Sequence, residues 1–252
     1  MSGAGVLLPG LMARVLLPLP THDFDVTEVV VPWRALLEAG HEVVFATPEG
    51  APARCDPLLL TGVVFGQLGA RPENVALYGD LERHPPFLSP LAYAAVDPVG
   101  FDALLLPGGH APGMRSYLGS AVLQDLVVAL WKREVPIGAI CHGSLVLARS
   151  IDPETGHSVV HQRTMTCLPK WMEWSAFALT FWKLGRYYRT YPAYVQDEVE
   201  DAGADVVRGP LHNDYDRPFV VEHDRLVTAR WPGDAAAFAQ RFVDRLGSAP
   251  TS

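Results

Sequence analysis

The sequence contains 252 residues, of which 49% are hydrophobic, and it carries a formal net charge of −8 at pH 7. This length and composition are sufficient for one substantial core. The negative charge and the absence of a dense Lys/Arg run argue against nucleic acid or an anionic membrane as partner and favour a small molecule. The three cysteines, Cys55, Cys141 and Cys167, have no metal-site or disulfide spacing, which is typical of a reducing cytoplasm.

We do not expect residues 1–12 to be a signal peptide. No stretch is long and apolar enough to span a bilayer, and residues 1–12 lack the basic region of a signal peptide. We expect residues 1–12 to be a flexible extension, residues 13–247 to form a single domain, and residues 248–252 to be a tail. The expected location is cytoplasmic.

The beginning of the domain predicts a βαβ unit. Residues 13–18 are typical of a strand, residues 25–39 repeat apolar side chains at helical spacing, and residues 42–47 are typical of the next strand. Such a unit makes parallel strands with a right-handed crossover, and ligands bind at their carboxyl ends. Residues 48–98 have no sustained periodicity, and we interpret them as an insertion that borders the site.

The same alternation of strands and helices continues to the end of the domain. The further predicted elements are, in order, a strand at 101–106, a helix at about 120–133, a strand at 135–140, a helix at about 143–149, a hairpin or edge strand within 156–167, a helix, turn and strand within 197–207, a hairpin at 219–229 and a helix at about 234–246. The fold class is therefore α/β with a mainly parallel sheet.

The segment Ala139 to Gly143 has the pattern small-x-nucleophile-x-small, with Cys141 at its centre. This pattern is typical of a nucleophile elbow, in which a sharp turn between a strand and a helix presents the reactive side chain. The amides at the start of the following helix would favour the thiolate and lower the pKa of the cysteine. The alternative is an unreactive cysteine buried in a turn.

Two glycines, Gly108 and Gly109, follow the strand at 101–106 and are followed by His110. A Gly-Gly loop exposes backbone amides, which could form an oxyanion hole facing the elbow. The alternative is an ordinary turn after a strand. His110 either lines the site or serves the loop itself.

Three motifs together resemble the ThiJ/PfpI superfamily, which is related to class I glutamine amidotransferases. They are the strand followed by Pro107 to His110, the elbow around Cys141, and the closing hairpin and helix. The resemblance covers about residues 13–247. It implies a flavodoxin-like three-layer sandwich, usually a homodimer, in which the elbow cysteine pairs with an acidic residue after the first strand.

Glu28 occupies the place of that acidic residue, and the segment Thr27 to Trp33 is similar to the glyoxalase III and heat-shock chaperone branch. Pro32 cannot donate a hydrogen bond to the carbonyl of residue 28, so we expect the helix to start or kink there. Our hypothesis is that this holds the Glu28 carboxyl near the sulfur. The alternative is a solvated glutamate in the first turn of a helix.

His142 follows the nucleophile directly, and in the branch that this chain resembles a cysteine and a histidine act together. A third group would complete a triad by orienting the imidazole. The sequence leaves the choice open among four acids, which are Asp214, Asp216, Glu222 and Asp224. The distant His-x-Glu pair of the amidotransferases has no convincing counterpart, so we do not expect glutamine hydrolysis.

A second insertion, near 168–196, is rich in aromatic residues. Trp171, Trp174 and Trp182 belong to one possible helical face, which predicts a core or dimer helix. The alternative is a lid over a pocket for a larger substrate, in which Lys183, Arg186 and Arg189 pair with an anionic group of that substrate.

The sequence contains no convincing spacing of metal ligands and no nucleotide-binding fingerprint, so we expect neither a metal nor a cofactor. Our functional hypothesis is an enzyme in which Cys141 attacks a small electrophile, Glu28 and His142 move protons, and Gly108, Gly109, His110 and Gly143 surround the substrate. The reaction would be hydration and isomerisation of a 2-oxoaldehyde, as in glyoxalase III, or a related hydration or hydrolysis, as in isonitrile hydratase. The alternative is a stress chaperone or cysteine redox sensor without turnover.

Overall fold

The structure is a computed structural model that describes residues 12–62 and 68–247. Apart from Met12, the predicted extension at 1–12 and the tail at 248–252 lie outside the described residues. None of the helices in the described ranges has the length and apolar character required to cross a membrane.

A seven-stranded sheet forms the centre of the molecule, with the strand order β10-β11-β7-β6-β1-β3-β5. Every neighbouring pair is parallel except β10 and β11, which form the predicted hairpin. Its strands are β1 (Arg14–Pro18), β3 (Glu42–Thr47), β5 (Leu91–Ala92), β6 (Ala103–Leu106), β7 (Ile137–Ile140), β10 (Val220–His223) and β11 (Leu226–Ala229). The predicted mainly parallel α/β sheet is therefore confirmed.

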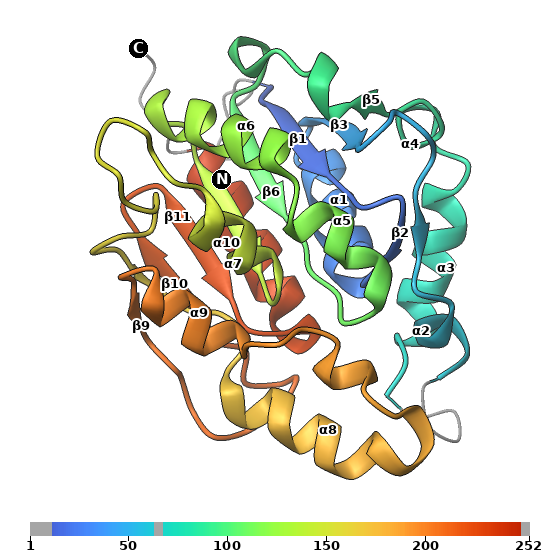
Figure 1. Cartoon of the computed structure of the whole chain (residues 1–252). Helices are drawn as coiled ribbons and strands as arrows, with labels where there is room; N and C mark the ends of the chain where they lie inside the picture. Colours follow the sequence, from blue (N-terminus) through green and yellow to red (C-terminus); the bar gives the residue numbers. More distant parts are fainter. Residues whose placement is uncertain (1–11, 63–67, 248–252) are drawn as a thin grey trace, which may run out of the picture.

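Helices cover both faces of this sheet (Figure 1). α1 (Val26–Glu38) packs beside α10 (Ala235–Gly247) on one face, and α6 (Ala121–Lys132) packs beside α7 (Gly143–Arg149) on the other. The central strands β6 and β7 are buried at every residue. Continuous apolar runs such as theirs are expected for parallel strands that are covered on both faces.

The remaining elements are short strand pairs, helices and turns outside the seven-stranded sheet. Two short parallel pairs join β2 (His22–Phe24) to β4 (Arg54–Cys55) and β8 (Thr164–Met165) to β9 (Asp205–Val206). The other α-helices are α2 (Pro57–Thr61), α3 (Pro72–Leu81), α4 (Pro85–Leu88), α5 (Arg115–Leu118), α8 (Lys170–Leu184) and α9 (Val195–Asp201). Short 3₁₀ turns occur at Tyr93–Ala95, Pro98–Gly100, Pro112–Met114, Tyr187–Arg189 and Pro232–Asp234.

The hairpin or edge strand predicted within 156–167 is mostly wrong. The segment contains only an isolated bridge from Ser158 to Ile151 and the two residues of β8. The extended run is interrupted at Gln162, whose φ of 58° lies in the left-handed region that strands do not use. Its amide donates to the carbonyl of Gly203, which joins this segment to the turn after α9.

α8 was predicted to be a core or dimer helix, and the core interpretation is wrong, whereas the dimer interpretation stays a prediction. Trp174, Phe181 and Trp182 are 58%, 56% and 60% exposed, whereas the buried residues of the helix are Glu173 and Thr180. Figure 1 places α8 at the edge of the molecule, away from the helices that cover the sheet. Helical spacing was therefore sufficient to predict the helix but not which of its faces is buried.

Candidate active site

Cys141 lies on the turn between β7 and α7, as the elbow pattern predicts. Its φ of 58° is unusual for a residue other than glycine, and such strain is found at nucleophile elbows. Gly143 has to be a glycine, because a Cβ there would lie 2.1 Å from the carbonyl oxygen of Leu106. The Cys141 amide donates to the carbonyl of Ala229 over 3.1 Å, which ties the elbow to β11. The thiol is 1% exposed.

Glu28 points inward from the first turn of α1 and is completely buried, so the interpretation as a solvated glutamate is wrong. The helix begins at Val26, close to the start predicted from the apolar spacing at 25–39, and Pro32 lies inside it rather than at its start. Glu28 Oε2 accepts a hydrogen bond from the Gly108 amide at 2.7 Å. The carboxyl also interacts with the Cys141 thiol, which brings together the two residues that the resemblance paired.

The Gly108 amide has a different role from the one predicted. Because it donates to Glu28, it is not available as an oxyanion donor. A Cβ on Gly108 would lie 2.6 Å from the His142 amide nitrogen and 2.9 Å from Glu28 Oε2. Gly109 is similarly close to the backbone, since its Cβ would lie 2.8 Å from the carbonyl oxygen of Asp23. Both glycines therefore allow the loop after β6 to approach Glu28 and the elbow.

Two imidazoles lie next to the sulfur. His142 Nδ1 is 3.4 Å from Cys141 Sγ, and the His142 ring is 4.5 Å from the His110 ring and 5.1 Å from the Tyr191 ring, measured between centroids. Burial lowers the pKa of His142 well below its ordinary value and that of His110 to about 4, so both are neutral near pH 7. The ring nitrogens of His110 and His142 and the sulfur lie within 4.8 Å of one another, close enough to share a metal ion.

The four acids considered as a third triad member make other contacts. Asp214 pairs with Arg217, Glu222 with Arg241 and Arg245, and Asp224 with Arg163, while the Asp216 amide donates to Asp214. After burial, the groups that lower the pKa of His142 are His110, Arg149 and Arg189, none of which is an acid. Within the described residues, His142 is thus placed by aromatic neighbours rather than by one of these carboxylates.

The protonation of the site differs from the sequence expectation of a thiol with a lowered pKa. Burial raises the pKa of Cys141 well above its ordinary value, and the negative charges of Glu28 and Asp25 raise it further. A hydrogen bond from the His142 backbone amide opposes this only in part. Burial also raises the pKa of Glu28 well above its usual range. Both shifts favour the protonated forms, a neutral thiol beside a neutral carboxylic acid.

Asp25 was missing from the residues selected in the sequence. Its Oδ1 caps α1 by accepting from the Thr27 and Glu28 amides at 2.8 and 3.2 Å, and its own amide donates to the carbonyl of Gly108 at 2.9 Å. Burial raises the pKa of its carboxyl to about 7. An aspartate directly before an apolar helical pattern is an N-cap signal, which could have identified it. No comparable sequence signal marks Tyr191.

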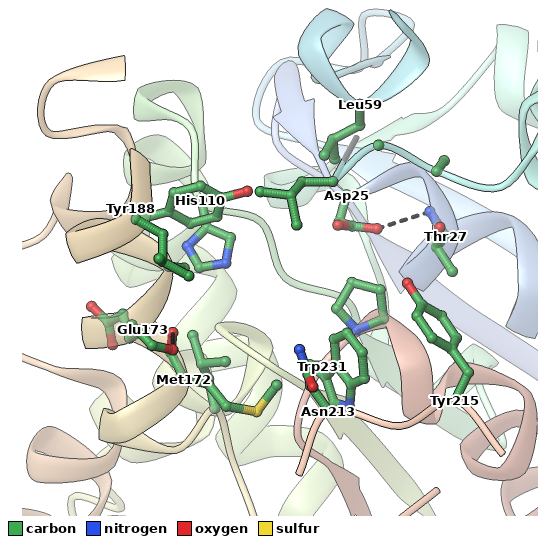
Figure 2. A pocket seen from close by; sticks show the side chains of 18 of the residues that line it. Asp25, Thr27, Leu59, His110, Met172, Glu173, Tyr188, Asn213, Tyr215 and Trp231 are labelled. Carbon is green, nitrogen blue, oxygen red and sulfur yellow. Dashed lines mark hydrogen bonds between the residues drawn. The ribbon is translucent and has the colours of Figure 1, made fainter. Parts of the chain in front are cut away.

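A pocket of about 200 Å³ lies beside these residues. Figure 2 shows Asp25 at one end and side chains along two facing sides, namely His110, Tyr188, Met172 and Glu173 on one side and Asn213, Tyr215 and Trp231 on the other. Leu59 and Ala70 contribute from the 48–98 segment, and Trp171 contributes from α8. His110 thus belongs both to the pocket wall and to the group around the sulfur.

Residues 19–210 match the family model described as ThiJ/PfpI family-like, in agreement with the resemblance of the motifs. The chain is 28% identical to a deglycase of Pyrococcus abyssi over 92% of its length and 99% of that protein. An uncharacterized protein of Schizosaccharomyces pombe is 31% identical over 54% of the chain, which covers half of that relative. A crystal structure of glyoxalase III from Candida albicans has a TM-score of 0.72 at 20% identity, covering 93% of this chain and 97% of that one.

Proposed function

Because this chain belongs to the ThiJ/PfpI-like family, we propose that it is a cysteine-dependent enzyme that converts 2-oxoaldehydes and water into 2-hydroxy acids without a cofactor. The observation that carries the proposal is the buried Glu28 carboxyl, which the Gly108 amide holds beside a thiol on a strained elbow. A relative named as a deglycase and a structural neighbour titled glyoxalase III support the same class of carbonyl chemistry.

A protonated Glu28 could supply the proton needed when the sulfur attacks the aldehyde. A protonated carboxyl offers one O–H donor and one carbonyl acceptor. Oε2 accepts from Gly108, and Oε1 is buried without a nitrogen or oxygen partner among the described residues, so Oε1 is the atom that can give its proton toward the sulfur or the substrate. His142 is neutral, and its Nδ1 is positioned to accept the thiol proton.

The proposed reaction needs no external oxidant or reductant. Sγ forms a bond to the aldehyde carbon as its proton leaves to His142, and Glu28 protonates the aldehyde oxygen to give a hemithioacetal. Glu28, now ionised, takes the proton from that carbon while protonated His142 gives its proton to the oxygen of the neighbouring carbon, which forms an enediol. Glu28 then protonates the neighbouring carbon and His142 takes the hydroxyl proton from the first, so that the first carbon is oxidised, the second is reduced and a thioester forms. Water then cleaves the thioester, releasing the 2-hydroxy acid and restoring the thiol.

The resting chemistry of Cys141 disfavours the alternative of a redox sensor. Sensor cysteines are accessible and have low pKa values. Here the thiol is 1% exposed, and burial raises its pKa. A chaperone without turnover would retain client holding whether or not Glu28 can transfer a proton, so the same variants separate that alternative from an enzyme.

The test measures consumption of methylglyoxal and formation of lactate without glutathione. We expect Cys141→Ser to lose turnover by a factor on the order of 10³ or more. Glu28→Gln, which keeps the shape of the side chain but not its acid, should lower kcat about 10²-fold or more. Cys55→Ser, in β4, is the matched thiol control and should remain active. Wild-type protein that forms no hydroxy acid, or a Glu28→Gln variant with full turnover, would refute the proposal.

A further inference from the structure

We infer that the pocket beside His110 receives an uncharged, apolar substituent of about the size of one aromatic ring, and that it discriminates against substrates carrying a carboxylate. This inference rests on the proposed function, because it names the kind of 2-oxoaldehyde that the Cys141 site would take. It also concerns binding alone, which can be measured without turnover.

The size of the pocket favours a ring over a methyl group. Its volume is about 200 Å³. An apolar protein cavity of roughly 150 Å³ is large enough to bind benzene. The methyl group of methylglyoxal would leave most of this space unfilled, and surface that remains in contact with water gives no hydrophobic gain.

The lining supplies apolar surface from two sides. Met172, Ala176 and Leu179 face the pocket from α8, and Tyr215 and Trp231 lie across from them (Figure 2). Flat side chains facing a methionine and small aliphatic groups suit a planar apolar group. One side of α8 therefore lines the pocket, and Trp174 and Trp182 of the same helix are exposed.

The charges of the lining argue against an anionic substrate. No lysine or arginine is among the described residues that line the pocket, and His110 is neutral near pH 7 because burial lowers its pKa to about 4. The acids there are Asp25 and Glu173. Arg189 neutralises Glu173 at 2.7 Å, whereas the hydrogen bonds to the Asp25 carboxyl come from the Thr27 and Glu28 amides. Above pH 7, where the Asp25 carboxyl is mostly ionised, a substrate carboxylate would therefore meet a like charge and no cation in the described lining.

This arrangement overturns the sequence expectation of an anion site. In the lid alternative, Lys183, Arg186 and Arg189 pair with a negative group of the substrate. None of the three lines the pocket, and Arg189 makes its ion pair with Glu173. The basic residues of this segment thus do not provide an anion-binding wall.

The pocket reaches the reactive sulfur through His110. A ring nitrogen of His110 lies within 4.8 Å of Cys141 Sγ, and the His110 side chain also lines the pocket. A 2-oxoaldehyde with its ring in the pocket would direct its carbonyl groups toward His110 and the elbow. The substituent and the reacting carbon would then occupy adjoining spaces.

The kinetic test compares methylglyoxal, phenylglyoxal and 4-carboxyphenylglyoxal. We expect kcat/KM for phenylglyoxal to exceed that for methylglyoxal by about tenfold or more, since burying a few CH₂-sized groups is sufficient for this factor. The carboxylated compound should be at least about tenfold poorer than phenylglyoxal, and Asp25→Asn should reduce that penalty. Equal kcat/KM for all three compounds would overturn the inference while leaving the proposed function intact.

A matched pair of variants locates the effect. Ala176→Phe fills the pocket from α8, whereas Ala178→Phe makes the same change two residues later, at a position outside the pocket lining. We expect the first to abolish the preference for phenylglyoxal and the second to keep it. Equal behaviour of the two variants would refute the assignment of this pocket.

A binding measurement keeps the inference independent of catalysis. Acetophenone carries the ring but lacks the aldehyde, and its binding can be followed by the fluorescence of Trp171 and Trp231. We expect wild-type protein and Ala178→Phe to bind it, Ala176→Phe to lose binding, and 4-acetylbenzoate to bind at least about tenfold more weakly. If this pattern holds and no aldehyde is turned over, the proposed function fails and the pocket assignment stands. Absence of acetophenone binding to wild-type protein would overturn the assignment.

Discussion

Burial controls the protonation of the acidic residues around Cys141. Asp25 caps α1 and Glu28 lies in its first turn. The charge of Asp25 raises the pKa of Glu28, and both charges raise the pKa of the Cys141 thiol. An ionised carboxyl without a cationic partner is costly inside a protein. Here the buried carboxyl of Glu28 lies next to the nucleophile Cys141. Strongly shifted pKa values are concentrated at such sites in enzymes.

Asp25 should make the protein less stable as the pH rises. Its pKa is raised from 3.8 to about 7, so between these values the folded state binds more protons than the unfolded state. The stability contribution is fully present below pH 3.8 and is lost as the pH rises through about 7. Asn cannot ionise but still caps a helix. Asp25→Asn should therefore be more stable than wild type at pH 8, by roughly 2–4 kcal/mol, and similar to it near pH 4.

Urea unfolding followed by circular dichroism at a series of pH values measures this difference. The control is Asp125→Asn, which makes the same change at an exposed position of α6. That variant should follow the wild-type profile. An Asp25→Asn profile parallel to that of wild type from pH 4 to pH 8 would contradict the buried, protonated state of this carboxyl.

The sequence predicts the nucleophile more readily than its surroundings. Cys141 could be selected because the turn motif is a local pattern, and Glu28 because the segment Thr27 to Trp33 resembles the family. Tyr191 and the pairing of Gly108 with Glu28 depend on segments 80 or more residues from Glu28 in the chain, which only folding brings together. The lowered pKa predicted for Cys141 was wrong for the same reason. Other segments bury the elbow, and this burial raises the pKa more than the local helix amides lower it.

At the scale of elements, the loop after β6 separates the pocket from the elbow. His110 closes this boundary, with its ring 4.5 Å from the ring of His142 and 4.7 Å from that of Tyr188. His110 is thus next to both the pocket and the sulfur, which is 1% exposed, and we expect a substrate that enters through the pocket to pass this imidazole. The position of the loop thus controls access to the nucleophile.

We expect His110→Ala to increase the rate of Cys141 alkylation by iodoacetamide about tenfold, because thiol reactivity depends on access as well as on the thiolate fraction. The experiment uses a Cys55→Ser/Cys167→Ser background so that a single thiol reacts. His84→Ala, which removes a partly buried imidazole that packs on Trp33 outside the site, is the control. An unchanged alkylation rate in His110→Ala would rule out this boundary.

The periodic elements could be predicted because their apolar residues pack in place on the sheet. The helices at α1, α6 and α10 and the strands β6 and β7 have this property. α8 does not, since most of its aromatic side chains do not pack on the core. Its orientation is set by contacts such as that of Glu173 with Arg189, which a helical periodicity does not encode.

At the scale of the whole molecule, the carboxyl-terminal elements pack against the amino-terminal elements that carry the acids of the site. α10 packs on α1, which carries Asp25 and Glu28. A completely buried ion pair, Arg230 with Asp234, links the end of β11 to the start of α10. The homodimer expected from the family resemblance stays a prediction.

This ion pair holds several segments in register. Arg230 also donates to the carbonyl of Pro210, and Asp234 accepts from the amide of Phe219. The loop between these residues carries Asn213 and Tyr215, which line the pocket. The negative charge of Asp234 also raises the pKa of Glu28, although it is the smallest of the effects that act on that group. Loss of the pair should therefore affect both folding and the pocket.

Removing the arginine alone should be severely destabilising, because it leaves the Asp234 charge buried without its partner. We expect Arg230→Met to lower the free energy of unfolding by about 3–5 kcal/mol. Arg34→Met, which breaks the exposed pair with Glu38 on α1, is the control and should change it by less than about 1 kcal/mol. Urea unfolding at pH 7 measures both. Similar midpoints for the two variants would contradict a stabilising role for the buried pair, because an uncompensated internal charge cannot be as well tolerated as a broken contact in water.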